Sequence, residues 1–482
     1  LVELQLVNVD ITADYTLANA IDATDTVNWN GGEGWNPIGD ATVQFTGSFD
    51  GDFYTISNLY INRPSDSYVA LFGYIWGAEV KEILLSDVNI TGKAEVASLV
   101  GGMRDSSVSY AGVSGGTVTG TSTDQNSLGG LVGYAAYNSS LTIVSKSFAS
   151  VTVQATSGVY PSNRTGGFIG GIYYGAIVED SYATGNVSGI TKTAGFAGDV
   201  TQTSIVRRSY SIGYVNGTRG LIGFNFQGGT TENSYWDTET SGHTTSNGGT
   251  GKTTSLMMAE ATFNTWDFAS VWGIAEGETY PYLQWKYPST PHGVSGTVYS
   301  DTGSTNIGAN KTIALAINGS LYGTTVKTGN NGFYYFLLED ADLALGHEVL
   351  AYIDGDATNA NTVTSVGSAG QTGLDLYAGN LIVRHDTGSS LTNAQLSNAH
   401  YTDSGDVIYS VSGSDLTATE GLYIWTSDTY APGGDVTVAG NWTNSGTFTY
   451  GTSTVTFNGA ATQNLNPGSS SFYGLTISNT TA

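Results

Sequence analysis

Carboxylates, a few cations and many tyrosines are the side chains of this sequence that can do chemistry. Enzymes that cleave polysaccharides use paired carboxylates as acid and base, often beside a cation, and aromatic rings can stack on the sugars. The candidates in the first half of the chain are Asp50, Asp52, Asp66, Asp87, Asp105, Glu179, Asp180, Asp199, Arg104, Arg207 and Arg208, with Tyr60, Tyr74, Tyr134, Tyr173, Tyr174 and Tyr214 as stacking rings. These carboxylates show no common position in successive repeats, so a solvated acidic face is the simpler interpretation. The alternative interpretation is that these residues bind or cleave carbohydrate.

Signatures of other active sites are weak. The five histidines are scattered, and the absence of Cys excludes thiolate ligands and cysteine catalysis. Residues 354–359 carry oxygen ligands at alternate positions, as the start of a calcium loop does, but they lack its turn glycine and its closing Glu. We therefore expect no enzyme, no catalytic residue and no cofactor, with calcium at 354–359 as the alternative.

Composition narrows the range of partners. The 482 residues include 41 Asp and Glu against 15 Lys and Arg, which gives a formal net charge of -26. Such a surface repels nucleic acid and anionic membranes, and no basic patch compensates for it. No apolar run approaches the roughly 18 residues of a membrane span. We expect neither nucleic acid binding nor membrane insertion, and the length predicts several domains.

A repeat organises the first half of the chain. An apolar-apolar-Gly step recurs six times, with its glycines at positions 73, 101, 133, 170, 198 and 223. We call these the motif glycines, and they are the first landmark of the repeat. A Ser-Tyr pair, the second landmark, follows the last three of them, at Ser181, Ser209 and Ser234. The residues that begin the six steps, and that we expect to fill the core, are Leu71, Leu99, Leu131, Phe168, Phe196 and Leu221.

Units of this length cannot bury both faces of their short strands alone. Stacked units bury these faces, because the strands of each coil hydrogen-bond to those of the next coil about 4.8 Å away. The inward side chains of successive coils then pack on one another. Thr, Val, Ile and Tyr recur in short alternating stretches, and helical periodicity is rare. The sequence therefore predicts an all-β fold whose first part is a parallel β-helix.

The repeat also resembles a known family. Gly166–Gly170 followed by Ser181–Val187 looks like the GLUG repeat of large bacterial surface and secreted proteins, and residues 35–39 and 280–285 resemble the two ends of such arrays. The resemblance covers residues 1–285. It implies a right-handed parallel β-helix in a bacterial, extracellular or cell-surface setting, and it implies no conserved chemistry.

The second half has a different pattern. Residues 286–292 contain two of the eight prolines and predict a linker. Residues 293–373 alternate between apolar and polar types with hairpin turns, which predicts an Ig-like or prealbumin-like antiparallel β-sandwich. They resemble carboxypeptidase-regulatory modules that act as spacers. Residues 374–482 form a C-terminal β-rich repeat region, interpreted as a second small β-solenoid or sandwich.

The two ends of the chain suggest assembly. Apolar residues alternate near the start of the chain and then change phase, as in one bulged strand, and others close the chain in a strand-like pattern. The residues that we expect to pair with neighbouring copies are Val2, Leu4, Leu6, Val9, Ile11, Phe472, Leu475 and Ile477. The resulting hypothesis is a non-enzymatic extracellular structural protein, either an adhesin or a filament subunit joined end to end. Its partners would be copies of itself and surface glycans.

Overall fold

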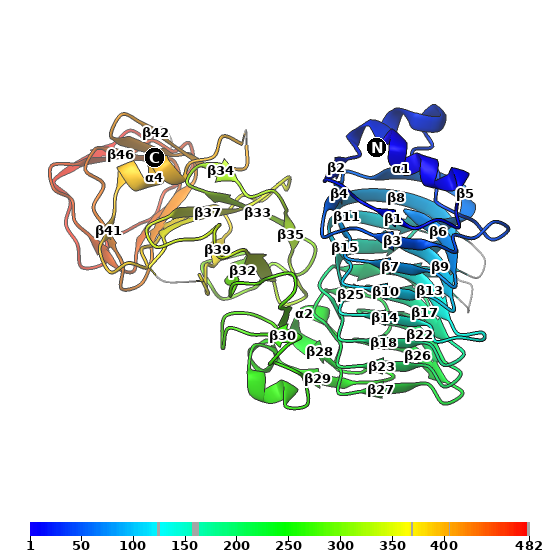
Figure 1. Cartoon of the computed structure of the whole chain (residues 1–482). Coiled ribbons are helices and arrows are strands. Elements are labelled where there is room, and N and C mark those ends of the chain that lie inside the picture. The colour runs from blue at the N-terminus through cyan, green and yellow to red at the C-terminus, as the bar shows by residue number, and fades with distance from the viewer. Residues whose placement is uncertain (123–125, 157–162, 368–369, 404, 480–482) are drawn as a thin grey trace. The chain divides into compact units, whose positions relative to one another are not determined.

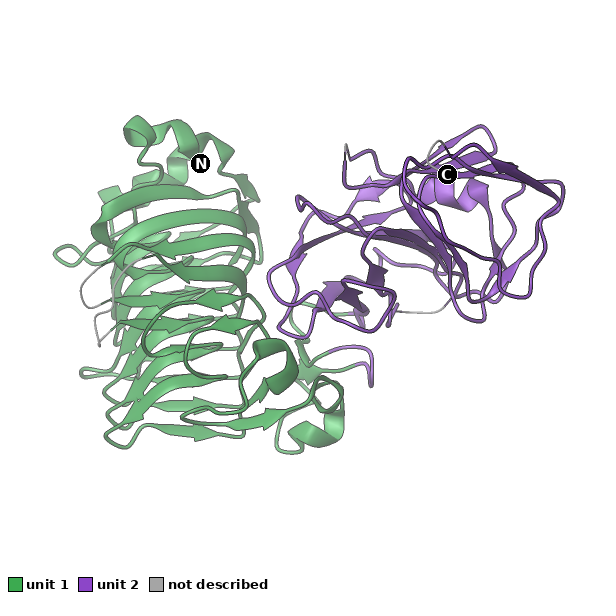
Figure 2. Cartoon of the chain, turned by 180° about the vertical axis from the view of Figure 1, so that it is seen from behind, with its two compact units in different colours: residues 1–274, 280–288 green, residues 275–279, 289–482 purple. Residues whose placement is uncertain are grey.

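The structure is a computed structural model that describes residues 1–122, 126–156, 163–367, 370–403 and 405–479. The chain forms two compact units, coloured separately in Figure 2. Unit 1 comprises residues 1–274 and 280–288, and unit 2 comprises residues 275–279 and 289–482. Among the described residues, no helix is both long enough and apolar enough to cross a membrane.

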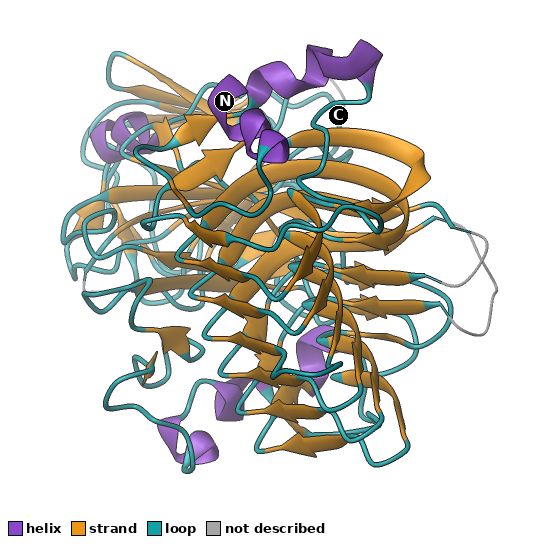
Figure 3. Cartoon of the chain, turned by 45° about the vertical axis from the view of Figure 1, so that its right-hand side comes forward, coloured by secondary structure: helices purple, strands orange, loops and turns teal. Residues whose placement is uncertain are grey.

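Unit 1 is a parallel β-helix, whose stacked coils are seen from the side in Figure 1 and obliquely in Figure 3. Its coils contribute strands to three parallel sheets, as the repeat predicted. The eight-stranded sheet contains β1 (Tyr15–Thr16), β3 (Ser48–Asp50), β7 (Glu79–Lys81), β10 (Ser107–Ser109), β14 (Ile143–Ser145), β18 (Ile177–Glu179), β23 (Ile205–Arg207) and β27 (Thr230–Glu232). The six-stranded sheet contains β6 (Phe72–Trp76), β9 (Val100–Arg104), β13 (Val132–Ala136), β17 (Ile169–Tyr173), β22 (Ala197–Thr201) and β26 (Ile222–Phe226).

The third sheet of unit 1 is the largest, with fifteen strands. Its long strands β5, β8, β11 and β15 run the width of the coil, and shorter strands continue the same surface. Its members are β2 (Ile21–Asp22), β4 (Thr55–Ser57), β5 (Tyr60–Val69), β8 (Leu84–Val96), β11 (Gly112–Gly120), β12 (Ser127–Gly129), β15 (Phe148–Ala155), β16 (Arg164–Gly166), β19 (Tyr182–Ala183), β20 (Val187–Ser188), β21 (Thr193–Ala194), β24 (Tyr210–Ser211), β25 (Val215–Asn216), β28 (Tyr235–Asp237) and β29 (Thr250–Lys252).

The six residues expected in the core lie one above another. The backbone N–H of Leu131 donates to the carbonyl of Phe168 at 2.9 Å, and Phe168 donates to Phe196 at 2.9 Å. The rings of Phe168 and Phe196 stack with centroids 4.9 Å apart and nearly parallel planes. All six side chains are fully buried in one continuous core, namely Leu71, Leu99, Leu131, Phe168, Phe196 and Leu221.

The motif glycines are required because successive coils approach each other closely there. A Cβ atom on Gly101 would lie 2.6 Å from the carbonyl oxygen of Gly73 in the preceding coil. The same distance separates a Cβ on Gly198 from the oxygen of Gly170, and a Cβ on Gly223 from that of Gly198. Backbone atoms cannot yield at this distance, so a larger residue would push the coils apart.

The serines of the second landmark bridge neighbouring coils. Each Oγ donates to the carbonyl two residues before it, for example Ser181 to Glu179 at 2.8 Å. The same Oγ accepts the backbone N–H of the serine in the preceding coil, as Ser209 does from Ser181 at 3.3 Å. Ser234 accepts from Ser209 in the same way. The hydroxyl therefore satisfies backbone groups at a buried corner, which explains why the two landmarks stay in step.

The first residues of unit 1 differ from the prediction. Residues expected to form a bulged strand form helix α1 (Val2–Gln5) and the 3₁₀ helix η1 (Leu6–Val9), followed later by η2 (Thr24–Gly32). Leu4 and Val7 are buried in the core, whereas Val2, Leu6 and Val9 are exposed. Alternation over so few residues fits a helical face as well as a strand, because Leu4 and Val7 lie three apart. The prediction of an N-terminal pairing strand was therefore wrong.

After its last coil the chain returns along the flank of unit 1. The return includes helices α2 (Thr238–Ser241), α3 (Thr254–Met257) and η3 (Glu260–Phe263) and the antiparallel strands β30 (Trp272–Gly273) and β31 (Tyr282–Leu283). Trp272 packs beside Tyr182 and Tyr210, whose rings stack 5.2 Å apart, and Tyr210 donates its hydroxyl to the carbonyl of Pro281 at 2.6 Å. The tyrosines of the second landmark are thus covered rather than free to bind.

Unit 2 begins as an antiparallel sandwich. One sheet contains β36 (Phe333–Leu338), β32 (His292–Tyr299) and β39 (Leu376–Tyr377). The other has nine strands and combines antiparallel members with a parallel continuation. Its strands are β33 (Thr312–Ile317), β34 (Ser320–Leu321), β35 (Val326–Lys327), β37 (Glu348–Ile353), β38 (Asn361–Ser365), β40 (Asn380–Val383), β44 (Gly421–Ile424), β47 (Trp442–Asn444) and β50 (Leu465–Asn466).

The later part of unit 2 stacks parallel strands as a short solenoid. A three-stranded sheet holds β41 (Ser390–Leu391), β45 (Thr429–Tyr430) and β48 (Thr447–Phe448), and helix α4 (Asn393–Ala399) precedes a five-stranded sheet. That sheet contains β42 (Tyr409–Ser412), β43 (Asp415–Ala418), β46 (Val436–Val438), β49 (Thr454–Phe457) and β51 (Gly474–Ile477). The ranges 293–373 and 374–482, expected as separate regions, lie in one compact unit because β38 pairs with β40.

Candidate functional site

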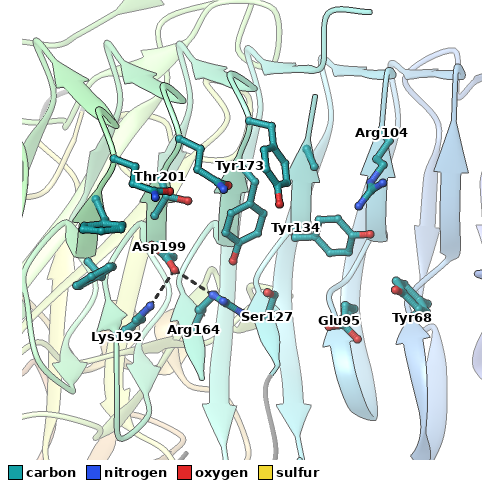
Figure 4. Close-up of a pocket in the computed structure, with 16 residues that line it drawn as sticks. Tyr68, Glu95, Arg104, Ser127, Tyr134, Arg164, Tyr173, Lys192, Asp199 and Thr201 are labelled. Atoms are coloured by element: carbon teal, nitrogen blue, oxygen red, sulfur yellow. Dashed lines mark hydrogen bonds and ion pairs between the residues drawn. The ribbon is translucent and has the colours of Figure 1, made fainter. Parts of the chain in front are cut away.

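A groove of about 420 Å³ runs along the flank of the β-helix, and Figure 4 shows the side chains that line it. One wall consists of outward residues of the six-stranded sheet. The other consists of residues at the edge of the fifteen-stranded sheet, where each coil turns toward the six-stranded sheet. Cations, carboxylates and aromatic rings all face it. The main lining residues are Tyr68, Glu95, Arg104, Ser127, Tyr134, Arg164, Tyr173, Tyr174, Lys192, Asp199, Thr201, Phe224 and Phe226.

The first wall is a register row in which large residues and glycines alternate as far as Gly171. Strand pairing aligns Tyr74, Gly102, Tyr134, Gly171, Asp199 and Phe224, each one residue after a motif glycine. A Cβ on Gly102 would lie 2.7 Å from the ring of Tyr134, and a side chain on Gly171 would collide with the hydroxyl of Tyr173. The two glycines thus leave room for the tyrosine rings to lie over the sheet.

The second wall is a row of polar residues six positions before the motif glycines. Glu95, Ser127, Arg164 and Lys192 hold this place in four successive coils, and the pairing of β12 with β16 sets Ser127 beside Arg164. The carboxylates considered from sequence alone showed no common position, and the two carboxylates of the groove also lie at different offsets, Asp199 one residue after a motif glycine and Glu95 six before one. The polar residues of the second wall, taken without regard to charge, do recur at one offset.

Aromatic rings cross the groove at nearly constant intervals. Ring centroids lie 6.3 Å apart for Tyr68 and Tyr134, 6.3 Å for Tyr134 and Tyr173, and 6.4 Å for Tyr173 and Tyr174. Tyr134 also forms a hydroxyl hydrogen bond of 3.2 Å with the buried Tyr74. Tyr174 is 52% exposed and Phe226 is 55% exposed, so apolar ring faces are available to a ligand.

Asp199 is the buried anion of the groove. Its Oδ2 accepts from Arg164 Nε and from Lys192 Nζ, each at 3.0 Å, while its side chain is only 3% exposed. Within the described part of the chain, its Oδ1 has no hydrogen-bond partner. A single Asp carboxylate cannot neutralise both Arg164 and Lys192, so this cluster of three residues carries a net positive charge.

Burial disfavours the ionised forms of Glu95 and of the groove tyrosines. Burial raises the pKa of Glu95 to about 7, although Arg164 and Lys93 oppose the shift. Burial likewise raises the pKa of Tyr134 and of Tyr173. Near neutral pH, Glu95 is therefore only partly ionised and the phenols remain hydrogen-bond donors. The groove thus carries less negative charge than its residue types suggest.

Arg104 is the third cation of the groove. Among the described residues it forms no ion pair, and its Nε has no hydrogen-bond partner. Its guanidinium lies 6.0 Å from the ring centroid of Trp76, at the outer limit of a cation–π contact. Arg104 neighbours Ala136 on β13, two residues along from the Tyr134 row.

The structure brings five of the predicted carbohydrate residues together and separates the rest. Asp199, Arg104, Tyr134, Tyr173 and Tyr174 line the groove. Tyr74 lies in the row of Tyr134 and bonds to it but does not line the groove, and neither do Tyr60, Tyr214, Asp50, Asp52, Asp66, Asp87, Asp105, Glu179, Asp180, Arg207 and Arg208. Sequence reasoning missed Tyr68, Glu95, Arg164 and Lys192, and the offset of six before the motif glycine was the signal that would have found the last three.

Several of the separated residues have structural roles. Asp105 accepts three backbone N–H groups, from residues 138 to 140, which hold the pKa of its carboxyl far below its ordinary value. Arg208 bonds to both oxygens of Asp180 at 2.7 Å and also reaches Glu179, and Arg207 bonds Glu179 as well. These ion pairs tie one coil to the next.

The predicted calcium loop is divided by the structure. Asp356 pairs with Lys311 at 2.7 Å, whereas Asp354 lies in a cluster with Asp403 and Asp406, their carboxylate oxygens within 4.8 Å of one another. Burial and the two neighbouring carboxylates raise the pKa of Asp354. Hydrogen bonds from Tyr352 to Asp403 and from the Gly355 N–H to Asp406 use part of these oxygens. Calcium binding here stays a prediction.

Comparison with known proteins bears on the coil that forms the middle of the groove. A family model of the GLUG motif matches residues 162–188. This GLUG segment contains Arg164, Phe168, Tyr173 and the Ser181–Tyr182 landmark. The resemblance seen in the sequence is thereby supported for one coil, and the other coils repeat its glycine and core positions in register.

Two curated proteins are similar to longer stretches. Halomucin of Haloquadratum walsbyi is 37% identical over 300 residues, which is 59% of this chain but 3% of halomucin. The immunoglobulin A1 protease of Streptococcus sanguinis is 28% identical over 217 residues, which is 39% of this chain and 11% of that protein. The chain therefore spans a small part of each relative. No solved structure matches the chain.

Proposed function

We propose that the chain belongs to an extracellular surface protein and that the flank groove of its β-helix binds carbohydrate, as the binding module of an adhesin would. The similarity to halomucin, the GLUG motif and the stacked-coil fold support the setting. The setting in a bacterium, which the GLUG resemblance implied, stays a prediction. The resemblance of residues 293–373 to a prealbumin-like module also stays one.

The observation that carries this proposal is the line of tyrosine rings with exposed Tyr174 and Phe226 at one end. The C–H groups on one face of a sugar ring are weakly positive, and they pack on the negative face of an aromatic ring. The phenol hydroxyls and Asp199 supply hydrogen-bonding groups in the same groove. Hollows lined by aromatic rings with a few convergent polar groups are typical ligand sites.

Binding without cleavage is the function that this geometry favours. Glycoside hydrolysis by paired carboxylates needs two of them, but Asp199 already pairs with two cations and is almost completely buried. Glu95 alone supplies an acid and no partner base. The similarity to an immunoglobulin A1 protease leaves enzymatic activity open, and the 28% identity covers only part of each chain.

Removing the exposed rings tests the proposal. The double variant Tyr174→Ala, Phe226→Ala is expected to bind its glycan about tenfold more weakly, because each lost ring contributes roughly 0.5–1.5 kcal/mol. Binding is measured on a glycan array and then by calorimetry with the best glycan. Tyr137→Ala is the control, since Tyr137 is 39% exposed and does not line the groove. Equal loss in the control, or no glycan bound by the unchanged protein, contradicts the proposal.

Self-association is a second candidate, and the exposed end of the small solenoid favours it. Strand β51 is the last described member of its sheet, and its residues Leu475 and Ile477 are 48% and 65% exposed. An unpaired strand edge with apolar side chains is a template for another strand. Phe472 is partly buried against Trp442, so it contributes to the core instead. At the other end, α1 and η1 occupy the place of the predicted pairing strand.

A charge on this edge tests self-association. The double variant Leu475→Lys, Ile477→Lys is expected to abolish fibres in electron micrographs of the purified chain, because the added charges face a chain pairing there. Val2→Lys and Val9→Lys, at exposed apolar positions of the N-terminal helices, serve as the control and should leave fibres unchanged. Fibres that persist in the β51 variant, or a monomeric unchanged protein, refute this candidate.

A further inference from the structure

The charge of the groove differs in sign from the charge of the chain. Acidic residues outnumber basic ones 41 to 15 in the whole sequence. In the groove, the cations Arg104, Arg164 and Lys192 face only Asp199 and the partly ionised Glu95. A protein with few cations has placed three of them around one hollow, where the surrounding acidic surface makes a positive site stand out.

Structural pairing accounts for two of these cations but not for the third. Arg164 and Lys192 hold Asp199, and each also lies over a ring, with Arg164 5.3 Å from Tyr173 and Lys192 4.1 Å from Phe224. Arg104 has no acidic partner among the described residues. Figure 4 shows Arg104 at the opposite end of the groove from the Asp199 cluster, near Tyr134. Its role is thus not explained by the fold.

We propose that the ligand of the groove is a carboxylate-bearing sugar, such as a uronic acid unit of a polysaccharide, whose carboxylate is bound by Arg104. This inference rests on the proposed carbohydrate-binding function and specifies the class of the ligand. A guanidinium offers paired N–H donors that match the two oxygens of a planar carboxylate. The tyrosine rings between Arg104 and Asp199 bind the sugar ring, and the excess positive charge of Arg164 and Lys192 favours a ligand with further acidic units.

Matched acidic and neutral sugars test the inference. Calorimetry at pH 8 compares tetragalacturonate, tetramannuronate and hyaluronan hexasaccharide with their methyl esters, which keep the sugar and remove the charge. A sulfated carrageenan tetrasaccharide without carboxylate is included as a second anion. We expect at least one carboxylated oligosaccharide to bind ten times or more tighter than its ester, and tighter than the sulfated sugar.

Two variants assign the effect to the groove. Arg104→Gln is expected to lose the tenfold preference for the acid, so that the acid and its ester bind with about equal affinity. Lys81→Gln removes the same charge from the eight-stranded sheet, outside the groove, and should change neither affinity. Glu95→Gln should strengthen binding of the acidic sugar at pH 8, because it removes a carboxylate that is ionised above its pKa of about 7. Thermal unfolding of each variant checks that the β-helix is intact.

The outcomes separate this inference from the proposed function. Equal binding of acid and ester, a preference for the sulfated sugar, or a preference that survives Arg104→Gln overturns the assignment of a carboxylated sugar while leaving carbohydrate binding in place. Binding of none of the sugars, acidic or neutral, on the array and in solution overturns both.

Discussion

Replacing Gly133 with Val is expected to lower the free energy of unfolding of unit 1 by about 3 kcal/mol, the upper range for overpacked sites. A Cβ at this position would collide with the carbonyl oxygen of Gly101 and lie 3.1 Å from the backbone carbon of Glu95. Both obstacles are backbone atoms of the neighbouring coil. That coil can move only by breaking its own hydrogen bonds, for example the 3.1 Å bond from Leu99 to Leu131.

Urea unfolding followed by circular dichroism measures this loss. Gly77→Asn is the matched control, because nothing lies within 4 Å of a Cβ there and Asn tolerates the positive φ of 64°. An unchanged unfolding midpoint for Gly133→Val would show that the coils can separate locally. The close-approach account of the motif glycine would then be wrong.

Trp272→Ala should destabilise unit 1 by about 3–5 kcal/mol, the usual cost of removing a buried large aromatic side chain. Trp272 is fully buried, and its ring centroid lies 4.4 Å from that of Trp266. Its indole N–H also donates to Asp180 at 3.3 Å. The variant therefore opens a cavity and weakens the network in which Asp180 and Arg208 tie two coils together.

Thermal unfolding with Trp272→Phe and Leu256→Ala as companions separates these contributions. Trp272→Phe keeps part of the ring contact and loses the N–H donor, so its loss of stability should fall between zero and that of Trp272→Ala. Leu256 belongs to the same returning segment but is 47% exposed, and its truncation should cost little. Equal stability of Trp272→Ala and the unchanged protein would mean that the returning segment does not support the coils.

The sequence predicted the β-helix well because its signal is steric and repetitive. Apolar residues before a glycine must lie inward in every coil, and Phe168 and Phe196 stack as this rule requires. The N-terminal helices escaped prediction because residues 2–11 are too few to distinguish a period of two from a helical face. Residues 293–373 and 374–482 lie in one unit because strand β38 pairs with β40, for example Asn361 with Leu381. No local sequence pattern reveals this pairing.

The candidate groove was only half predictable. Tyr134, Tyr173, Asp199 and Arg104 were recognised by type, but composition does not say which face of a coil they share. The alignment of the coils on their glycines would have placed Glu95, Arg164 and Lys192 in one row, because parallel pairing keeps equal offsets together. The ionisation of Glu95 depends on burial, which appears only once the coils are stacked.

Strand pairing between neighbouring coils has an evolutionary consequence. Among the described residues, the strands of each coil pair only with strands of the coils before and after it, so a gene can gain or lose a whole unit, such as the stretch from Gly170 to Gly198, by unequal recombination while the ladder of strands is kept. Every insertion lengthens the molecule by about 4.8 Å. It also adds one residue position to each row of the groove, so the length of the β-helix and the ligand preference of the groove can change in the same genetic event.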